Sequence, residues 1–452
     1  MSGITVPATD HHIVISADSH CGADLRGYRP YLEQRFHDEF DTWVDPIEAE
    51  YARIEARLKD KDRSVRNVGI DGDPVLDADR NFSSERRLRE QEADGVIATV
   101  LFPNTQPPFA PLATTSFEAP GYDADIEHRW YVKDDGPQML CSPGDETHSD
   151  PCDARPEEVD VALAIERINA AQTRAIRQVN SSWAGLRAHN RWLLDLIGEA
   201  PERRAGIAQI FLADVEGSVA EIEWAAENGF RGGILLPGAP PGSPFEPLYA
   251  KCYEPIWAAA EANRMPVNHH SGGATPDFGN HFPSSLAMFM LEVTWWSQRA
   301  LWHLMFSGVF ERHPDLQFVN TETGTAWIPE VLGRLDSFYD RMKHSKYGSE
   351  SVFGGMAVAG MSLTPSEYWR RQCHVGASFM RPTEVDLCRE IGIDNVMWGS
   401  DYPHIEGSHP YTKEHLRLTF AGQPEDEVVK VLTTNVAELY DFDLDALLPL
   451  AE

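Results

Sequence analysis

Short apolar segments alternate with stretches of helical periodicity along this chain, and no other feature constrains its fold as strongly. Strands that alternate with helices are typical of parallel α/β proteins and not of sandwiches or helix bundles. Eight such segments predict a (β/α)8 TIM barrel in preference to a six-stranded doubly wound sheet, which would also need a glycine-rich nucleotide-binding turn that we do not find. The predicted strands cover 13–16, 95–102, 204–212, 231–236, the region of 267, 316–321, 373–375 and 396–399, and predicted helices include 216–228, 255–263 and 297–306.

The 452 residues are predicted to form a single barrel domain, 1–452, with two insertions at its mouth, the end where the carboxyl termini of the strands emerge. Residues 103–160 follow the second predicted strand and are rich in Pro, Gly, Asp and aromatic residues, which predicts a lid or a subunit contact. Residues 340–370 carry four glycines and predict a second long loop over the mouth.

Charge and cysteine content exclude several classes of protein. The formal net charge of −32 argues against binding to nucleic acid or to an anionic membrane surface, because both need clustered Lys and Arg. No apolar stretch approaches the length of a membrane span. The six cysteines include no C-x-x-C pair and no secretory signal is recognised, so a reduced, cytoplasmic setting is expected.

Carboxylates and imidazoles follow three of the predicted strands at the point where the apolar run stops. They lie in the fragments 18–20 (Asp-Ser-His), 268–272 (Asn-His-His-Ser-Gly) and 398–404 (Trp-Gly-Ser-Asp-Tyr-Pro-His). Parallel barrel strands present the residues at their carboxyl ends to one shared mouth, so side chains far apart in sequence can converge on one ion. The sequence therefore predicts a metal site at the mouth.

These fragments and several others resemble the metal-dependent amidohydrolase superfamily, in the branch that includes aminocarboxymuconate semialdehyde decarboxylase. The resemblance covers most of the chain, and its most specific part is the segment 392–404. It implies a TIM barrel that carries a mononuclear catalytic metal site. The segments that carry the resemblance are 18–20, 190–192, 201–203, 267–272, 308–316, 322–324, 327–329 and 392–404.

The resemblance implies that Asp18, His20, His270 and Asp401 hold one divalent metal ion, and that Asp401 also moves a proton. The family usually has His-x-His after its first strand, whereas this chain has Asp18 in the first of these positions. A harder oxygen ligand shifts preference from zinc toward manganese, so manganese or zinc is expected, with iron as a further candidate. His269 is expected to point away from the site, because neighbouring residues of a strand face opposite sides.

The sixth predicted strand departs from the commonest family pattern. That strand usually ends in a histidine two residues before a glycine, but here Glu322 occupies the position. Glu322 is predicted either to act as a general acid or base near the ion or to support its ligands, with His374 or His404 then supplying the imidazole.

Two reactions are compatible with this predicted site. A metal-activated water would make the chain a hydrolase of a small carboxylated or aromatic molecule, with Asp401, Glu322 and His270 in catalysis, and this is the preferred prediction. The alternative is a metal-dependent nonoxidative decarboxylase of the same class of substrate. A barrel that binds a ligand without catalysis is a third hypothesis, which a metal assay would separate from the other two.

Substrate contacts are predicted less sharply than metal ligands. His404, His374 and Phe109 are candidates, and further aromatic residues in the predicted mouth loops favour a hydrophobic or aromatic small molecule. A carboxylate of the substrate would need an arginine from the same loops. The aromatic residues are Phe109, Trp130, Tyr131, Phe278 and Phe282, and the candidate arginines are Arg26, Arg29 and Arg381.

Three tryptophans on one predicted helical region, Trp295, Trp296 and Trp302, suggest an oligomer. A homodimer or a larger homo-oligomer is therefore expected, although packing of these rings between helix and barrel is the preferred interpretation of the three tryptophans.

Overall fold

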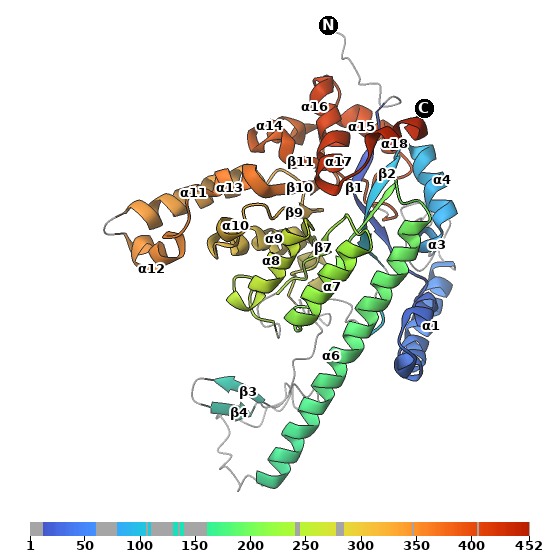
Figure 1. The fold of residues 1–452 in the computed structure, drawn as a ribbon, viewed down its shortest axis with the longest axis vertical. Coiled ribbons are helices and arrows are strands. Elements are labelled where there is room, and N and C mark those ends of the chain that lie inside the picture. Colours follow the sequence, from blue (N-terminus) through green and yellow to red (C-terminus); the bar gives the residue numbers. More distant parts are fainter. Residues whose placement is uncertain are drawn as a thin grey trace.

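The structure is a computed structural model that describes residues 12–59, 79–104, 107–109, 130–133, 136–139, 161–239, 245–276, 284–345, 348–404 and 406–451. Within these ranges, short parallel strands form the centre of the molecule and helices surround them (Figure 1). The central strands are β1 (Ile15–Cys21), β2 (Ala98–Pro103), β5 (Arg204–Gly206), β6 (Ala208–Gln209), β7 (Ile234–Leu235), β8 (Val267–His270), β9 (Phe318–Thr321), β10 (Cys373–Ala377) and β11 (Val396–Trp398).

The strands pair in chain order and close into a barrel. One sheet runs β1-β2-β5 and the other runs from β6 through β7, β8, β9 and β10 to β11, and β5 and β6 are two halves of the third barrel strand on either side of Ile207. The first and last strands meet at a parallel bridge between Ser19 and Tyr402, where the His20 amide donates to the Tyr402 carbonyl at 2.6 Å. The predicted (β/α)8 TIM barrel is thus confirmed.

Helices cover the barrel because their apolar faces pack against the strands. The predicted helices at 216–228 and 255–263 correspond to α7 and α8, and α9 begins earlier than the predicted 297. The first half of α9 is apolar on nearly all sides, so it shows no clear helical period. The helices are α1 (His37–Lys59), α3 (Asp79–Phe82), α4 (Ser84–Asp94), α6 (Val161–Gly198), α7 (Val215–Glu227), α8 (Glu254–Ala262), α9 (Ser285–Phe306), α10 (Val309–Arg312), α11 (Ile328–His344), α12 (Ser349–Val358), α13 (Pro365–Gln372), α14 (Val385–Ile391), α15 (Thr412–Thr419), α16 (Glu425–Val429), α17 (Asn435–Tyr440) and α18 (Leu444–Ala451).

The prediction of a long mouth loop at 340–370 is wrong. The end of α11, all of α12 and most of α13 occupy this segment. Met356 and Met361 share a cavity wall with Phe306 and Ser307 at the end of α9, the helix that leads into β9. The segment therefore lies toward the end of the barrel opposite the mouth. Its glycines allow close packing: a Cβ atom on Gly354 would lie 2.6 Å from the sulfur of Met342.

Most of the predicted lid, 103–160, lies outside the described residues. The described part includes an antiparallel hairpin of β3 (Trp130–Lys133) and β4 (Gly136–Met139). No helix among the described residues is long and apolar enough to cross a membrane.

Candidate metal centre

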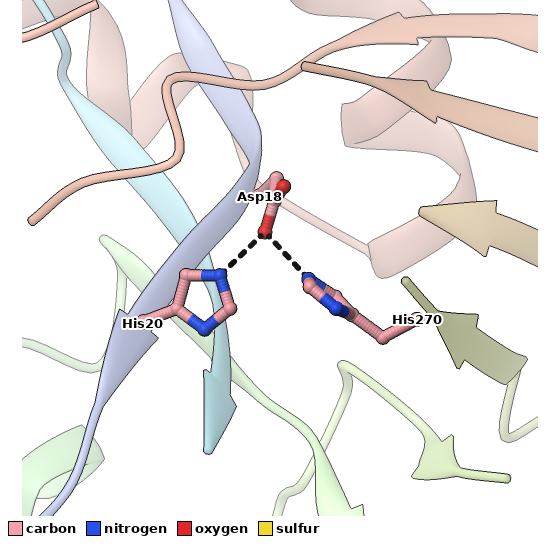
Figure 2. A group of neighbouring side chains, drawn as sticks. All are labelled: Asp18, His20 and His270. Carbon is pink, nitrogen blue, oxygen red and sulfur yellow. Dashed lines mark hydrogen bonds and ion pairs between the residues drawn. The ribbon is translucent and has the colours of Figure 1, made fainter. Parts of the chain in front are cut away.

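Four of the predicted ligands converge where the first and last strands of the barrel meet. Asp18 and His20 lie on β1, His270 is the last residue of β8, and Asp401 follows β11. Figure 2 shows the imidazoles of His20 and His270 pointing at the same carboxylate oxygen of Asp18. Both Nε2 atoms lie 3.4 Å from Asp18 Oδ1, and His20 Nε2 lies 3.0 Å from Asp401 Oδ1.

Local backbone geometry brings these side chains together. Asp401 has a φ of 58° and Glu322 a φ of 56°, in the left-handed region that non-glycine residues seldom occupy. Such a conformation costs on the order of 1–3 kcal/mol and is concentrated at functional sites. Gly399 allows β11 to approach β1, because a Cβ atom there would lie 2.6 Å from the Asp18 Cβ.

The residues present fit a divalent cation. Asp18 and Asp401 are fully buried, and among the described residues Asp401 Oδ2 has no hydrogen-bond partner. Both imidazoles turn Nδ1 toward a backbone carbonyl, Pro103 O at 3.4 Å for His20 and Ser271 O at 2.9 Å for His270, which leaves Nε2 facing the carboxylates. Oxygen and imidazole donors with a carbonyl behind each ring are the usual surroundings of a catalytic metal.

Electrostatics hold the two kinds of side chain in opposite charge states. Burial opposes ionisation of Asp18, but His270 and His20 outweigh it and keep the pKa of this carboxyl below its usual range. Burial lowers the pKa of His20, but hydrogen bonds to Asp18 and Asp401 outweigh it and raise this pKa well above 6.5. His270 behaves in the same way: burial is outweighed by Glu322 and Asp18, and its pKa is raised.

Metal affinity should therefore rise as the pH rises toward the raised pKa values of His20 and His270, which lie above the 6.5 of a free imidazole. Below their raised pKa values His20 and His270 carry protons that an ion must displace, whereas Asp18 is already ionised there. Each displaced proton makes affinity up to about tenfold stronger per pH unit. Calorimetric titration of the metal-free protein with Mn²⁺, in buffers of different ionisation enthalpy, would count the released protons. Affinity that does not change with pH would contradict these charge states.

Ser378 is a site residue that the sequence analysis missed. It follows β10, is buried, and its hydroxyl donates to Asp18 Oδ2 at 2.5 Å. This bond occupies one carboxylate oxygen of Asp18 and leaves Oδ1 for the imidazoles. A serine one residue beyond an apolar strand could have been flagged by the same strand-end argument that selected Asp18.

Replacing Ser378 with Ala should weaken metal binding by about 10–100-fold, the usual effect of losing a group that orients a ligand. Among the described residues, the Ser378 hydroxyl is the side-chain donor to Asp18 Oδ2, so the carboxylate of the variant would lose this bond and could rotate. Ser408→Ala is the matched control, since this hydroxyl faces Ser400 O and Thr412 instead. Competition with a chromophoric chelator would measure the metal affinity of both variants. If the two variants bound metal equally tightly, Ser378 would not orient Asp18.

Glu322 and His404 also lie at this centre. Glu322 Oε2 is 3.3 Å from His270 Nδ1, and His404 Nδ1 is 2.9 Å from Asp401 Oδ1. The His404 ring stacks on His20 with 4.0 Å between ring centroids, and its Nε2 lies 3.1 Å from Asn104 Oδ1. Burial, with Asp401 and Asp18 adding to it against the opposing effect of His270, raises the pKa of Glu322 to about 8.

Two predicted substrate contacts do not reach this cluster. His374 is near the start of β10, the end opposite the mouth, and its Nε2 lies 2.9 Å from Gln317 Oε1. A residue near the amino end of a barrel strand lies at the end of the barrel opposite the mouth. The prediction that His374 contacts substrate is therefore wrong. Phe109 packs against Phe36, Phe40 and Trp43 beside α1, an aromatic cluster.

Other aromatic residues occupy different places than expected. Phe102 contacts the site instead of Phe109, with its ring centroid 4.7 Å from that of His270. Phe278 and Phe282 lie outside the described residues, as do the side chains of Trp130 and Tyr131. Phe102 lies near the carboxyl end of β2, so its position in the predicted strand was available from the sequence. An apolar residue at this position is, however, hard to distinguish from a residue of the hydrophobic core.

The three candidate arginines already have acidic partners in this chain. Arg26 pairs with Asp45 and Glu48, Arg29 with Asp41, and Arg381 with Glu384. His269 is fully buried, with Nδ1 3.0 Å from Leu236 O, so it points away from the metal centre as expected.

The chain is similar in sequence to several curated decarboxylases. The gamma-resorcylate decarboxylase of a Rhizobium sp. is 24% identical over 293 residues, which cover 63% of this chain and 84% of that enzyme. The gamma-resorcylate decarboxylase of Rhodococcus jostii is 25% identical over 307 residues, covering 64% and 85%. Among solved structures, 5-carboxyvanillate decarboxylase of Novosphingobium aromaticivorans, complexed with manganese and 4-hydroxy-3-methoxy-5-nitrobenzoic acid, is similar with a TM-score of 0.58 at 18% identity, covering 98% of this chain and 99% of that one.

The structural likeness supports the barrel fold, and the family assignment rests on the sequence. A profile of the family described as amidohydrolase matches residues 124–442, which is well over half of the chain. This range includes His270, Glu322 and Asp401 but begins after Asp18 and His20, whose place in the centre rests on geometry. The chain belongs to the amidohydrolase family.

Proposed function

We propose that this chain is a metal-dependent nonoxidative decarboxylase of an aromatic carboxylic acid. The observation that carries the proposal is the convergence of Asp18, His20, His270 and Asp401 on one point at the barrel mouth. The relatives named above are decarboxylases of aromatic acids, so they favour decarboxylation over the hydrolysis preferred from the sequence.

The four residues would hold one divalent ion, which would supply positive charge to bind the oxygens of the substrate and to stabilise charge that develops during the reaction. Manganese is the proposed ion. The two carboxylate ligands favour a hard cation, and the related 5-carboxyvanillate decarboxylase was solved with manganese.

The protein must deliver a proton to the ring carbon that loses CO2. The bond between that carbon and the carboxyl group breaks, CO2 leaves, and the electron pair takes up the proton. Glu322 is the proposed donor, because its raised pKa keeps it protonated near neutral pH. A cation bound beside it would lower that pKa toward neutrality, where a carboxyl group can both give and recover a proton.

His404 is proposed to orient Asp401 and to contact the substrate. Its two ring nitrogens face Asp401 and Asn104, so the ring is held at the mouth while it covers the face of His20. Phe102 provides an apolar wall beside His270, which suits an aromatic ring.

The test is to incubate the manganese-loaded protein with ortho-hydroxylated benzoates, including gamma-resorcylate and 5-carboxyvanillate, and to measure CO2 and the decarboxylated phenol. The metal-free protein is the control. Release of CO2 in equal amount to the phenol would support the proposal. Hydrolysis of esters or amides without CO2 release would establish the hydrolase instead, and a protein that binds no metal would support a non-catalytic barrel.

A further inference from the structure

Strand β1 changes the face that it turns toward the barrel interior just before the proposed metal ligands. Ile15 and Ala17 pack inside the barrel with Met397 of β11. Regular alternation along the strand would then turn Asp18 and His20 outward, against the surrounding helices. Both side chains instead face the centre at the mouth, as Figure 2 shows. The regular period of β1 is therefore broken between Ala17 and Asp18.

A β-bulge explains the change of face. Ser16 pairs with Thr99 and Ser19 pairs with Leu101, so the two residues between them on β1 lie opposite a single residue of β2. A bulge adds one residue to a strand, and a shift of one residue moves every later side chain to the other face. Cys21 packs between the strands and the helices instead of inside the barrel, as this shift requires.

Two buried serine hydroxyls hold the bulge from the outer side of the strands. Ser16 Oγ donates to the Asp18 carbonyl at 2.6 Å and accepts from the Asp18 amide at 3.4 Å. The hydroxyl oxygens of Ser16 and Ser400 lie 2.9 Å apart, and Ser400 Oγ is 3.3 Å from the same Asp18 carbonyl. A bulge interrupts the hydrogen bonds between strands, and buried backbone groups need other partners. The two hydroxyls supply those partners.

The same pair of serines fixes the turn that carries Asp401. The Ser400 amide donates to Ser16 Oγ at 2.8 Å, and the Tyr402 amide donates to Ser400 Oγ at 3.3 Å. Between them, the Asp401 amide donates to the Asp18 carbonyl at 2.9 Å. Three consecutive amides are thus held by the bulge and its two hydroxyls. This arrangement holds Asp401 at its positive φ of 58°.

We propose that Ser16 and Ser400 are positioning residues of the metal centre, whose hydroxyl pair holds the bulge and the turn so that the carboxylates of Asp18 and Asp401 face one ion. The neighbouring outward positions of the two strands, Val14 and Trp398, are apolar, so packing against the helices does not require a pair of hydroxyls. The inference rests on the proposed function, since it assigns these residues a role in holding the proposed ion.

Manganese affinity of the full chain tests the proposal, measured by competition with a chromophoric chelator. The double variant Ser16→Ala/Ser400→Ala should bind Mn²⁺ about 10–100-fold more weakly than the parent, the usual effect of losing groups that orient ligands. Each single variant should already be weakened. The loss in the double variant should be smaller than the product of the two single losses, because the two hydroxyls contact each other.

Ser218→Ala is the matched control. Ser218 is also fully buried, and its hydroxyl donates to the Phe211 carbonyl at 2.8 Å and accepts from the Phe211 amide at 3.0 Å, but it lies on α7. This variant loses a hydroxyl with the same pair of bonds, so its unfolding midpoint in urea should fall while its manganese affinity stays at the parental value. Weakened manganese binding in the control would overturn the proposal, because a general loss of stability would then explain the effect.

A second pair of variants separates the hydroxyl from the shape of the side chain. Ser400→Thr keeps a hydroxyl, whereas Ser400→Val has nearly the same shape as the Thr variant without one. The Thr variant should bind Mn²⁺ at least about tenfold more tightly than the Val variant. Equal affinities of these two variants, or parental affinity of the double Ala variant, would overturn the positioning role.

Crystal structures of the metal-free parent and the metal-free double Ala variant test the same role without an ion. The Asp18 carboxylate should turn away from His20 and His270 in the variant, and an unchanged arrangement of the three side chains would overturn the proposal. A parent that binds no manganese would refute the proposed metal centre, and the metal-free structures would still decide whether the two serines position Asp18.

Discussion

Replacing Asp401 with Asn should nearly abolish catalysis, lowering turnover by on the order of 10³-fold or more. Asp401 lies 3.0 Å from His20 Nε2 and 2.9 Å from His404 Nδ1, and its other oxygen is buried without a partner among the described residues. The amide removes a negative charge that both an ion and a protonated imidazole need. Metal affinity should fall together with turnover, by about 100-fold or more.

Asp441→Asn is the matched control for this change. Asp441 has a φ of 55°, close to the 58° of Asp401, but it is exposed and follows α17, away from the cluster. Elemental analysis and turnover measured on both variants would separate loss of the ion from loss of the fold. If the Asp401 variant retained full metal and parental turnover, the proposed centre would be wrong.

The second large effect is expected for Glu322→Gln, which should lower turnover about 10²–10³-fold while leaving bound metal unchanged. The amide has nearly the same shape as the carboxyl group but cannot deliver an acidic proton. A residue that donates a proton only during the chemical step changes kcat and leaves KM nearly unchanged. Stopped assays with gamma-resorcylate would measure kcat and KM of the variant, and elemental analysis would measure its bound metal.

Glu322→His provides the comparison variant, because the commonest family pattern has an imidazole here. It should recover part of the activity that the Gln variant loses, since imidazole can also donate a proton near neutral pH. Loss of metal in the Gln variant would instead make Glu322 a ligand. Parental turnover in the Gln variant would rule out the proton-donor role.

Most of the barrel could be predicted from the sequence because each strand is a short apolar run between polar segments. The apolar runs before His270 and Asp401 end within three residues of the ends of β8 and β11, whereas the first predicted strand, 13–16, stops five residues before the end of β1. The convergence of these side chains followed from strand direction alone. Their assignment as ligands depended on the family resemblance, since a strand-end histidine or aspartate has several other uses.

What could not be predicted depends on contacts between distant segments. The bond from Ser378 to Asp18 joins residues 360 positions apart. The place of Ser378 just after a strand could mark it as a site residue, but it could not show which side chain the hydroxyl contacts. His374 was misassigned because a weakly marked strand did not reveal at which end of β10 it lies. The glycines of 340–370 indicated a loop, whereas the packing of Gly354 on Met342 places them in a helical hairpin.

The seam where β1 meets β11 has a consequence for how the protein acquires its ion. Asp18 and His20 leave the ribosome about 380 residues before Asp401, which is roughly 20–80 s at ordinary rates of translation. Until β11 pairs with β1, the nascent chain lacks the carboxylate opposite His20. The complete set of proposed ligands therefore exists only after β11 has paired with β1, so the full centre cannot form on any earlier fragment of the chain.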